Sequence, residues 1–261
     1  MFQVTPIPAF NDNYIWLLAD AHSNRVAVVD PGDAAPVLKY LEQNSLVLAA
    51  ILITHHHQDH TGGVAELLKA FKVPVYGPRP SPFGGIDQPL QDSDSFELFG
   101  QTLHIREIPA HTLDHISYYC APRTDDETPQ LFCGDTLFLA GCGRLFEGSA
   151  HQLQQAMDYF ACLPDTTEVY CTHEYSLANL AFAAAVEPGN VHIQAAIKEC
   201  KALRANGDPT LPSHIGTEKK INPFMRTHTD SIRASASQHT GSALDAPADI
   251  MAAIRQWKNQ Y

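Results

Sequence analysis

A dense group of metal-binding side chains lies in residues 54–60, Thr-His-His-His-Gln-Asp-His. Imidazole nitrogens and carboxylate oxygens are ligands for Zn, Fe or Mn. His55 and His57 are two residues apart, so both can point toward one ion if the chain is extended there. Asp59 and His60 follow on the next part of the turn, where they can reach a second ion. The segment therefore predicts a site for two metal ions.

Three further candidate ligands each follow an apolar run that is typical of a strand. These ligands are His111, Asp135 and His173. Rigid strands hold the short loops that follow them, so four strand ends can deliver ligands to one rim of a sheet. An exposed polar loop or an adventitious metal trap would explain residues 54–60 alone, but it would not explain the three later side chains.

Seven side chains that share one carboxylate give each of two ions four protein ligands and leave room for a bridging water. Asp135 is the expected bridge, because a carboxylate has two oxygens whereas a neutral imidazole has one free nitrogen. Two cations lower the pKa of a bound water toward roughly 7 and place a nucleophile beside a Lewis acid. The predicted chemistry is hydrolysis of an activated carbonyl or phosphoryl centre, with Asp59 and Asp135 as its catalytic carboxylates.

Short strands and a few helices must position these ligands. Apolar runs separated by turn signals predict strands through the first half of the chain, and apolar residues three and four apart predict helices at residues 34–43, 62–71 and 151–162. Strands and helices mixed in this way predict a layered α/β or α+β sandwich.

The character of the sequence changes after Thr172. Residues 176–186, 191–205 and 246–258 are typical of helices. Residues 206–222, which contain Pro209, Pro212 and Gly216, predict an irregular loop between those helices. We therefore expect a small helical C-terminal unit.

Composition limits the classes of partner. The formal charge of -12 over 261 residues argues against a nucleic-acid or anionic-membrane surface, because such surfaces need clustered Lys and Arg. The first ten residues show no secretory signal, and no apolar run is long enough to span a membrane, so we expect a cytoplasmic protein. We also expect a monomer. The six cysteines include no C-x-x-C pair, which predicts reduced, buried thiols.

The H-x-H-x-D-H block at residues 55–60, with the three later ligands, resembles the metallo-β-lactamase superfamily, whose fold is an αββα sandwich. Within it the chain is similar, along nearly its whole length, to the hydroxyacylglutathione hydrolase (glyoxalase II) family. The resemblance implies a catalytic domain at residues 1–173 and a helical glutathione-binding domain at 174–261. The motifs that carry it are Asn11-Asp12-Asn13-Tyr14, Gly134-Asp135-Thr136-Leu137-Phe138, Ala140-Gly141-Cys142-Gly143-Arg144, Phe146-Glu147-Gly148, His173-Glu174-Tyr175 and Asn222-Pro223-Phe224-Met225-Arg226.

The resemblance implies hydrolysis of S-D-lactoylglutathione to glutathione and D-lactate, the second step of methylglyoxal detoxification. It implies that a hydroxide bridging two metal ions, Zn or else Fe or Mn, attacks the thioester carbonyl. The implied ligand sets are His55, His57 and His111 for one ion and Asp59, His60 and His173 for the other, with Asp135 between them.

The resemblance also implies glutathione contacts from Arg144, Phe146, Tyr175, Asn179 and Arg226. Arginine can hold the carboxylates of glutathione in two parallel hydrogen bonds. Many relatives have Lys where this chain has Arg144, and some have Tyr where it has Phe146, so a hydroxyl donor is absent at the second position. A surface ion pair is the alternative for Arg226. Arg233 belongs to no motif.

Three residues near the ligands have open roles. His56 should point away from its neighbours in an extended segment, which favours packing or support of a ligand. His115 either orients a ligand or begins the next strand, and Asp30 either accepts from a metal-bound imidazole or only makes a turn.

Other functions have weaker support from the sequence. A persulfide dioxygenase with one iron, a lactonase or a different thioesterase shares the metal domain, but the helical C-terminal segment with Asn222–Arg226 argues against each. A lactam hydrolase usually has a secretory signal, and a nuclease needs basic patches. A non-catalytic module would have lost some ligands, whereas all seven positions are filled here.

Overall fold

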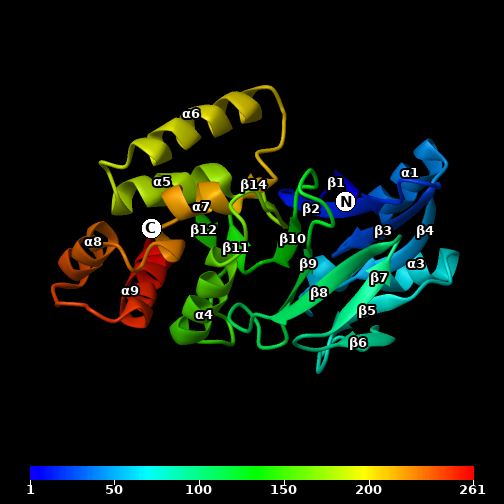
Figure 1. The fold of residues 1–261 in the computed structure, drawn as a ribbon, viewed down its shortest axis with the longest axis horizontal. Coiled ribbons are helices and arrows are strands. Elements are labelled where there is room, and N and C mark those ends of the chain that lie inside the picture. Colours follow the sequence, from blue (N-terminus) through cyan, green and yellow to red (C-terminus); the bar gives the residue numbers. More distant parts are fainter. The chain divides into compact units, whose positions relative to one another are not determined.

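The computed structural model describes residues 1–261, which form two compact units. The first unit comprises Met1–Glu107 and Asp114–Gly134, and the second comprises Ile108–Leu113 and Asp135–Tyr261. Strands and helices both occur in each unit, so the fold class is α+β, as predicted (Figure 1). The boundary predicted at residues 173 and 174 stays a prediction.

A six-stranded sheet, ordered as in the sequence, forms the framework of the first unit. β1, β2 and β3 are antiparallel, and β3 through β6 are parallel. Residues Val26 to Val29 of β3 are all buried, which is expected of a central strand covered on both faces. The strands are β1 (Gln3–Ala9), β2 (Asn13–Ala19), β3 (Arg25–Val29), β4 (Val47–Leu52), β5 (Val75–Pro78) and β6 (Gln88–Leu90).

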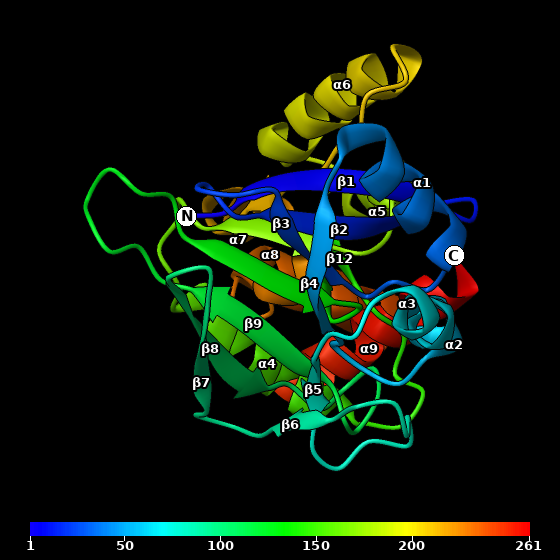
Figure 2. The ribbon, with the colours of Figure 1, turned by 90° about the vertical axis from the view of Figure 1, so that its right-hand side faces the viewer.

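Helices α1 (Ala34–Asn44) and α3 (Val64–Ala70) pack against one face of this sheet (Figure 2). Each helix buries an apolar stripe with helical spacing, formed by Val37 and Leu41 in α1 and by Val64 and Leu67 in α3. Asp33 caps α1 by accepting a hydrogen bond from the backbone N–H of Ala35. The short helix α2 (Gln58–Thr61) precedes α3.

Four antiparallel strands complete the first unit and pack on the sheet described above. They are β7 (Ser95–Leu98), β8 (Gln101–Glu107), β9 (Ile116–Cys120) and β10 (Gln130–Gly134). Phe96 of β7 stacks on Tyr76 of β5 with ring centroids 4.1 Å apart. The hydroxyl of Tyr118 in β9 donates to the carbonyl of Ile53 at 2.7 Å. These contacts hold the chain in place just before the histidine segment.

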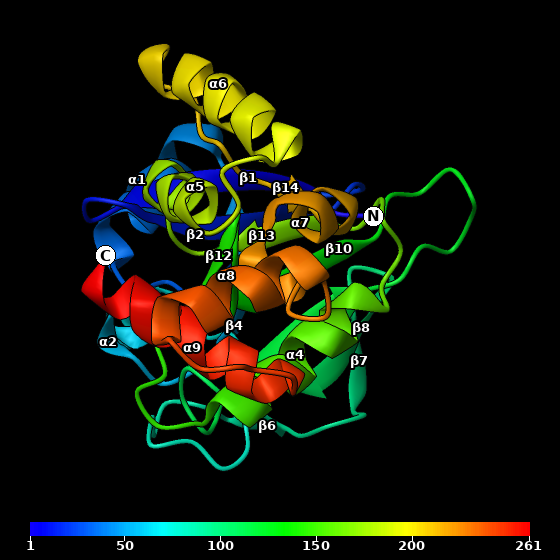
Figure 3. The ribbon, with the colours of Figure 1, turned by 90° about the vertical axis from the view of Figure 1, so that its left-hand side faces the viewer.

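The second unit is mostly helical, and α4, α8 and α9 lie side by side in it (Figure 3). Phe182 of α5 is fully buried against the rings of Phe224 and Trp257, which ties three helical segments together. No helix of the chain has both the length and the apolar character needed to cross a bilayer. The elements are β11 (Leu137–Phe138), β12 (Gly141–Cys142), α4 (Ala150–Ala161), β13 (Glu168–Cys171), α5 (Ser176–Val186), α6 (Val191–Ala205), β14 (Ser213–His214), α7 (Ile215–Ile221), a 3₁₀ turn (Pro223–Met225), α8 (Asp230–Thr240) and α9 (Pro247–Gln260).

Two predictions from the sequence are wrong. Residues 206–222 are not a loop throughout, because β14 pairs with β13 and α7 follows it. The inward face of α7 consists of Ile215, Glu218 and Ile221, and the acidic residue in the middle concealed its apolar periodicity. All six cysteines are free, as predicted, but Cys162 is exposed at the end of α4 rather than buried.

Glu218 is fully buried in α7. Its carboxylate accepts hydrogen bonds from the hydroxyl of Ser213, the backbone N–H of Ala140 and the side-chain amide of Asn222. Burial disfavours the charged form more than these donors stabilise it, so the pKa of Glu218 rises to about 7 from an ordinary 4.5.

We predict that Glu218 makes the protein less stable as the pH rises. A carboxyl group whose pKa is raised on folding contributes fully below pH 4.5, and this contribution is lost as the pH passes through about 7. The loss is about 3 kcal/mol. Urea unfolding of Glu218→Gln between pH 5 and 8 should lack this decline. Exposed Glu199→Gln is the control, and an identical pH slope in Glu218→Gln and the wild type would contradict the prediction.

Candidate metal centre

The first unit brings together four of the predicted ligands directly after β4. His55 is buried, and its Nε2 lies 3.1 Å from Nδ1 of His57. His57 is the N-cap of α2, so the chain turns there and places Asp59 and His60 in the helix. Nε2 of His60 lies 3.5 Å from Oδ2 of Asp59. The four side chains thus form two pairs, His55 with His57 and Asp59 with His60.

Asp30 supports this segment from the end of β3. Its Oδ1 accepts from the backbone N–H of Thr54 at 2.7 Å, and its Oδ2 accepts from the Thr54 hydroxyl at 2.7 Å. The same Oδ2 lies 3.0 Å from Nδ1 of His60. A carboxylate on Nδ1 leaves Nε2 of that imidazole for a metal ion. Of the two roles left open by the sequence, the structure supports the acceptor role for Asp30.

Gly32, in the turn that follows Asp30, permits a close approach of two loops. A Cβ atom on Gly32 would lie 1.8 Å from the carbonyl oxygen of Asp59. Any side chain at this position would therefore push the turn away from the segment that carries Asp59 and His60.

His56 and His115 pack beside the candidate ligands. Nδ1 of His56 lies 2.9 Å from a carboxylate oxygen of Asp114, which also accepts from the hydroxyl of Ser81. His115 stacks on His55 with ring centroids 4.5 Å apart and donates from Nδ1 to the carbonyl of Ile116. His56 therefore packs beside the candidate ligands, which is one of the two roles that the sequence favoured. His115 directly precedes β9 (Ile116–Cys120), and its stacking on His55 favours the role of orienting a ligand.

The second unit brings together the other three predicted ligands. Asp135 follows β10 and His173 follows β13, while His111 lies in the segment Ile108–Leu113. Oδ2 of Asp135 lies 3.5 Å from Nε2 of His111 and 3.2 Å from Nε2 of His173. One carboxylate oxygen therefore lies within reach of both histidines, which is the arrangement expected of a bridging ligand.

Backbone groups orient these three ligands. Nδ1 of His111 donates to the carbonyl of Arg144 at 2.8 Å, so its Nε2 is the nitrogen available to a metal ion. A Cβ atom on Gly143 would lie 1.9 Å from the carbonyl oxygen of Asp135 and 3.0 Å from the ring of His111. The glycine therefore lets the Arg144 segment approach both ligands.

Aromatic side chains flank the histidines of the second unit. Phe146 is 63% exposed, and its ring lies 5.2 Å from that of His111. Tyr175 stacks in parallel on His173 at 4.6 Å. Both are predicted glutathione contacts, and both lie against a candidate metal ligand. Asn179 is only 3% exposed, and its amide donates to the carbonyl of Leu139.

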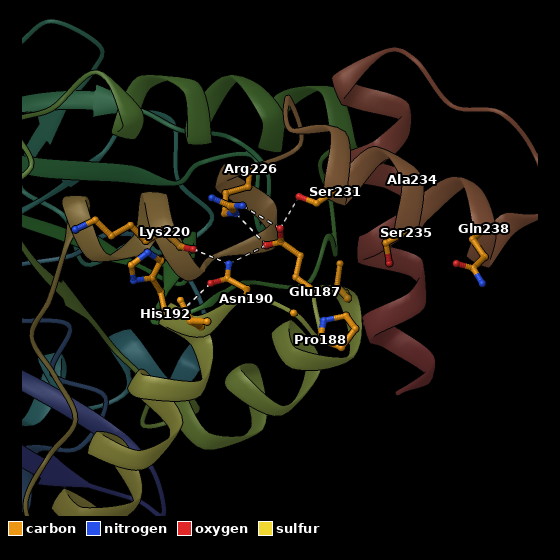
Figure 4. A pocket seen from close by; sticks show the side chains of 13 residues that line it. Glu187, Pro188, Asn190, His192, Lys220, Arg226, Ser231, Ala234, Ser235 and Gln238 are labelled. Carbon is orange, nitrogen blue, oxygen red and sulfur yellow. Dashed lines mark hydrogen bonds and ion pairs between the residues drawn. The ribbon is translucent and has the colours of Figure 1, made fainter.

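Arg226, another predicted glutathione contact, forms an ion pair within the protein. Its Nε and Nη2 bond to the carboxylate of Glu187 at 3.0 and 2.9 Å, beside a cavity of about 680 Å³ (Figure 4). Burial would raise the pKa of Glu187, but hydrogen bonds from Arg226 and Ser231 outweigh it and hold that pKa below its ordinary value. This ion pair is largely buried rather than on the surface, and a glutathione contact from Arg226 stays a prediction.

The sequence analysis missed two cations in α9. Arg255 is 4% exposed and donates to the carbonyl of Cys142 at 2.8 Å. Burial, and then the charges of Arg255 and Arg144, lower the pKa of Lys258 to about 8. We call Arg144, Arg255 and Lys258 the cationic cluster. The sequence did contain one indication of this cluster. Arg255 and Lys258 are three residues apart, which places both on one face of a helix in an otherwise acidic chain.

The chemistry of this donor set fits divalent metal ions. Five imidazoles and two carboxylates are the ligands that Zn, Fe and Mn accept. Asp30 and the carbonyl of Arg144 each engage Nδ1 of a candidate histidine, as is usual for metal-binding imidazoles.

Comparison with known proteins first identifies the superfamily and the fold of this chain. A family model described as the metallo-beta-lactamase superfamily matches residues 10–173. The structure of ETHE1 from Myxococcus xanthus is 21% identical, has a TM-score of 0.64 and covers 99% of this chain and 98% of that one. The BLEG-1 B3 metallo-beta-lactamase is 24% identical, with a TM-score of 0.62 over 86% of this chain and 99% of that one. The chain therefore has the metallo-β-lactamase fold.

The full-length relatives are more specific. A model described as the hydroxyacylglutathione hydrolase C-terminus matches residues 174–261. Proteins named hydroxyacylglutathione hydrolase from Pseudomonas fluorescens (strain SBW25) and Hahella chejuensis (strain KCTC 2396) are 47% and 48% identical, over 100% of both chains in each case. This chain belongs to the hydroxyacylglutathione hydrolase family.

We predict that Asp30→Ala strongly destabilises the protein. The substitution leaves the Thr54 N–H, its hydroxyl and Nδ1 of His60 without the buried carboxylate they now contact. Removing one partner of a buried charged network costs about 3 to 5 kcal/mol. Urea unfolding measures the loss, with exposed Asp125→Ala as the control. Equal unfolding midpoints for the two variants would show that Asp30 does not have this role.

Proposed function

We propose that this chain hydrolyses S-D-lactoylglutathione to glutathione and D-lactate, as the second step of methylglyoxal detoxification. The observation that carries the proposal is the geometry of Asp135, whose one oxygen lies within reach of both His111 and His173. Full-length identity of 47% to proteins named hydroxyacylglutathione hydrolase supports a thioester as the substrate.

Within this proposal, the seven predicted ligands hold two divalent metal ions. His55, His57 and His111 bind one ion, Asp59, His60 and His173 bind the other, and Asp135 contacts both. The pairs observed within each unit support this division. Zn is the proposed metal, with Fe or Mn as alternatives, because the donor set accepts all three. When bound, the ions supply a water of lowered pKa and polarise the thioester carbonyl.

The chain's own residues supply charge balance and orientation. Asp59 and Asp135 remove two positive charges from the centre, while the histidines bind as neutral imidazoles. Asp30 fixes the orientation of the His60 ring, and the carbonyl of Arg144 fixes that of the His111 ring. The thiolate of glutathione is a good leaving group, so no strong acid is needed to protonate it.

The cationic cluster is the proposed site for a carboxylate of glutathione. Arg255 donates to the carbonyl of Cys142, two residues before Arg144. Burial, and then the charges of Arg255 and Arg144, lower the pKa of Lys258. Tyr175 and Phe146, which lie against His173 and His111, would contact the peptide near the thioester, with Asn179 behind them. A contact from Arg226 would require the arginine to exchange Glu187 for the substrate.

The cellular setting remains part of the proposal. We expect a cytoplasmic monomer that acts on a small-molecule thioester and has neither a nucleic-acid nor a membrane partner. Size-exclusion chromatography with light scattering tests the monomeric state directly.

Loss of the thioester absorbance of S-D-lactoylglutathione tests the proposed function. Purified protein should hydrolyse the thioester rapidly, and removal of metal by a chelator should abolish turnover, because both the nucleophile and the Lewis acid are then lost. Asp135→Asn should lower kcat at least a hundredfold. A metal-loaded protein without turnover would exclude this function and favour persulfide or lactone substrates, which are the next to assay.

We predict that Lys258 acts on substrate binding rather than on the chemical step. Lys258→Ala should raise KM about tenfold with kcat unchanged, since a charge-assisted hydrogen bond contributes roughly 1.5 kcal/mol. Exposed Lys201→Ala is the matched control. An unchanged KM in Lys258→Ala, with Arg226→Ala raising it, would move the carboxylate site to Arg226.

The pKa of Lys258 predicts how KM varies with pH. Lys258 is protonated below about pH 8 and neutral above it, so KM should rise as the pH passes 8. Lys258→Arg stays charged and should show no such rise. Steady-state kinetics from pH 6 to 9 compare the two, and parallel profiles would contradict the assignment.

A further inference from the structure

The hairpin formed by β11 and β12 connects the segment of Asp135 to that of Arg144. Phe138 pairs with Gly141, so the turn between the strands contains only Leu139 and Ala140. Ala140 has a φ of 53°, in the left-handed region that disfavours residues with a Cβ atom. Such a conformation costs free energy, which contacts from the surrounding structure can offset.

Two buried side chains from α7 and its C-terminal end supply such contacts. The amide nitrogen of Asn222 donates to the carbonyls of Phe138 and Gly141 at 3.1 and 2.9 Å. The carboxylate of Glu218 accepts from the N–H of Ala140 at 2.8 Å and from the amide of Asn222 at 2.9 Å. Both side chains are fully buried. We call Glu218 and Asn222 the hairpin anchor.

The hairpin reaches both histidines of the second unit. The ring of Phe138 meets His173 edge-to-face at 5.8 Å and Tyr175 at 5.6 Å. After β12 the chain continues through Gly143 to Arg144, whose carbonyl accepts from Nδ1 of His111. If the hairpin moved, Phe138 would shift and the ring of His173 would turn with it. The hydrogen bond from His111 to the carbonyl of Arg144 would also break.

We propose that Glu218 and Asn222 are positioning residues for the hydrolysis, because they hold the β11–β12 hairpin and thereby aim His111 and His173. The effect on kcat rests on the proposed function, whereas the effect on metal binding does not. In this account, the helical segment that follows His173 acts on the metal ligands themselves, in addition to any contact it makes with the substrate.

The test combines steady-state kinetics with metal affinity, measured on the full-length holoenzyme by competition for Zn²⁺ with a chromophoric chelator. Asn222→Ala and Glu218→Ala should each lower kcat about tenfold, leave KM within twofold and raise the Zn²⁺ dissociation constant about tenfold. A tenfold loss is the lower end of what removing a support of a metal ligand usually costs.

Two further variants separate positioning from stability. Thr227→Val removes a buried hydrogen bond to Gln154 without touching the hairpin, so it should lower stability but leave kcat and Zn²⁺ affinity unchanged. Glu218→Gln keeps an oxygen for the Ala140 N–H and an amide that can donate to Ser213, so it should restore both values. Unchanged kcat and Zn²⁺ affinity in folded Asn222→Ala would overturn the proposal.

The remaining outcomes are also decisive. If Asn222→Ala does not fold, Asn222→Ser, whose hydroxyl reaches at most one of the two carbonyls, should show the same losses, and wild-type values for it would overturn the proposal. If the wild type does not hydrolyse the thioester while the alanine variants still lose Zn²⁺ affinity, the proposed function fails and the hairpin anchor stands.

Discussion

A histidine holds a metal ion tightly only when one ring nitrogen is aimed at the ion, and this requirement accounts for much of the buried polar structure here. Asp30 fixes His60 from the end of β3, the carbonyl of Arg144 fixes His111, and the ring of His115 lies flat against His55. Each support is buried or comes from the backbone, so solvent does not compete with it. Strands β3 and β4 are followed by Asp30 and by the segment of His55, and strands β10 and β13 are followed by Asp135 and His173, so these four strands position the candidate ligands and the support of His60.

Charge is the second constraint. The protein has a formal charge of -12, yet its proposed substrate carries two carboxylates. In the proposed function, Arg144, Arg255 and Lys258 provide positive charge in the second unit for a carboxylate of the substrate. The pKa of Lys258 is lowered to about 8 by burial and by those neighbours. Arg226 does not belong to the cationic cluster. Its charge is neutralised by the carboxylate of Glu187, with which it forms an ion pair.

Much of this account could be predicted from the sequence, because ligand chemistry and strand ends leave a strong local pattern. The pairing of His55 with His57 and the position of Asp135 between two histidines follow the spacing and donor types. Other features depend on tertiary contacts. Helix α7 was not predicted because its buried face includes the acidic residue Glu218. An acidic residue is not expected on a buried face unless the groups that donate hydrogen bonds to it are known. Arg226 lies in one of the motifs recognised in the sequence, whereas Lys258 lies in none of those. Only the structure shows that Arg226 pairs with Glu187 and that the charge of Arg144 acts on Lys258.

The central claim is that two metal ions, held by seven side chains, are required for hydrolysis of the thioester. The most direct measurement is a titration of chelator-treated protein with Zn²⁺ while the loss of S-D-lactoylglutathione absorbance is followed. The account predicts that activity rises to a plateau at two equivalents of Zn²⁺ per chain, and that Asp135→Asn does not reach that plateau. Full activity after one equivalent, or in the absence of metal, would contradict it.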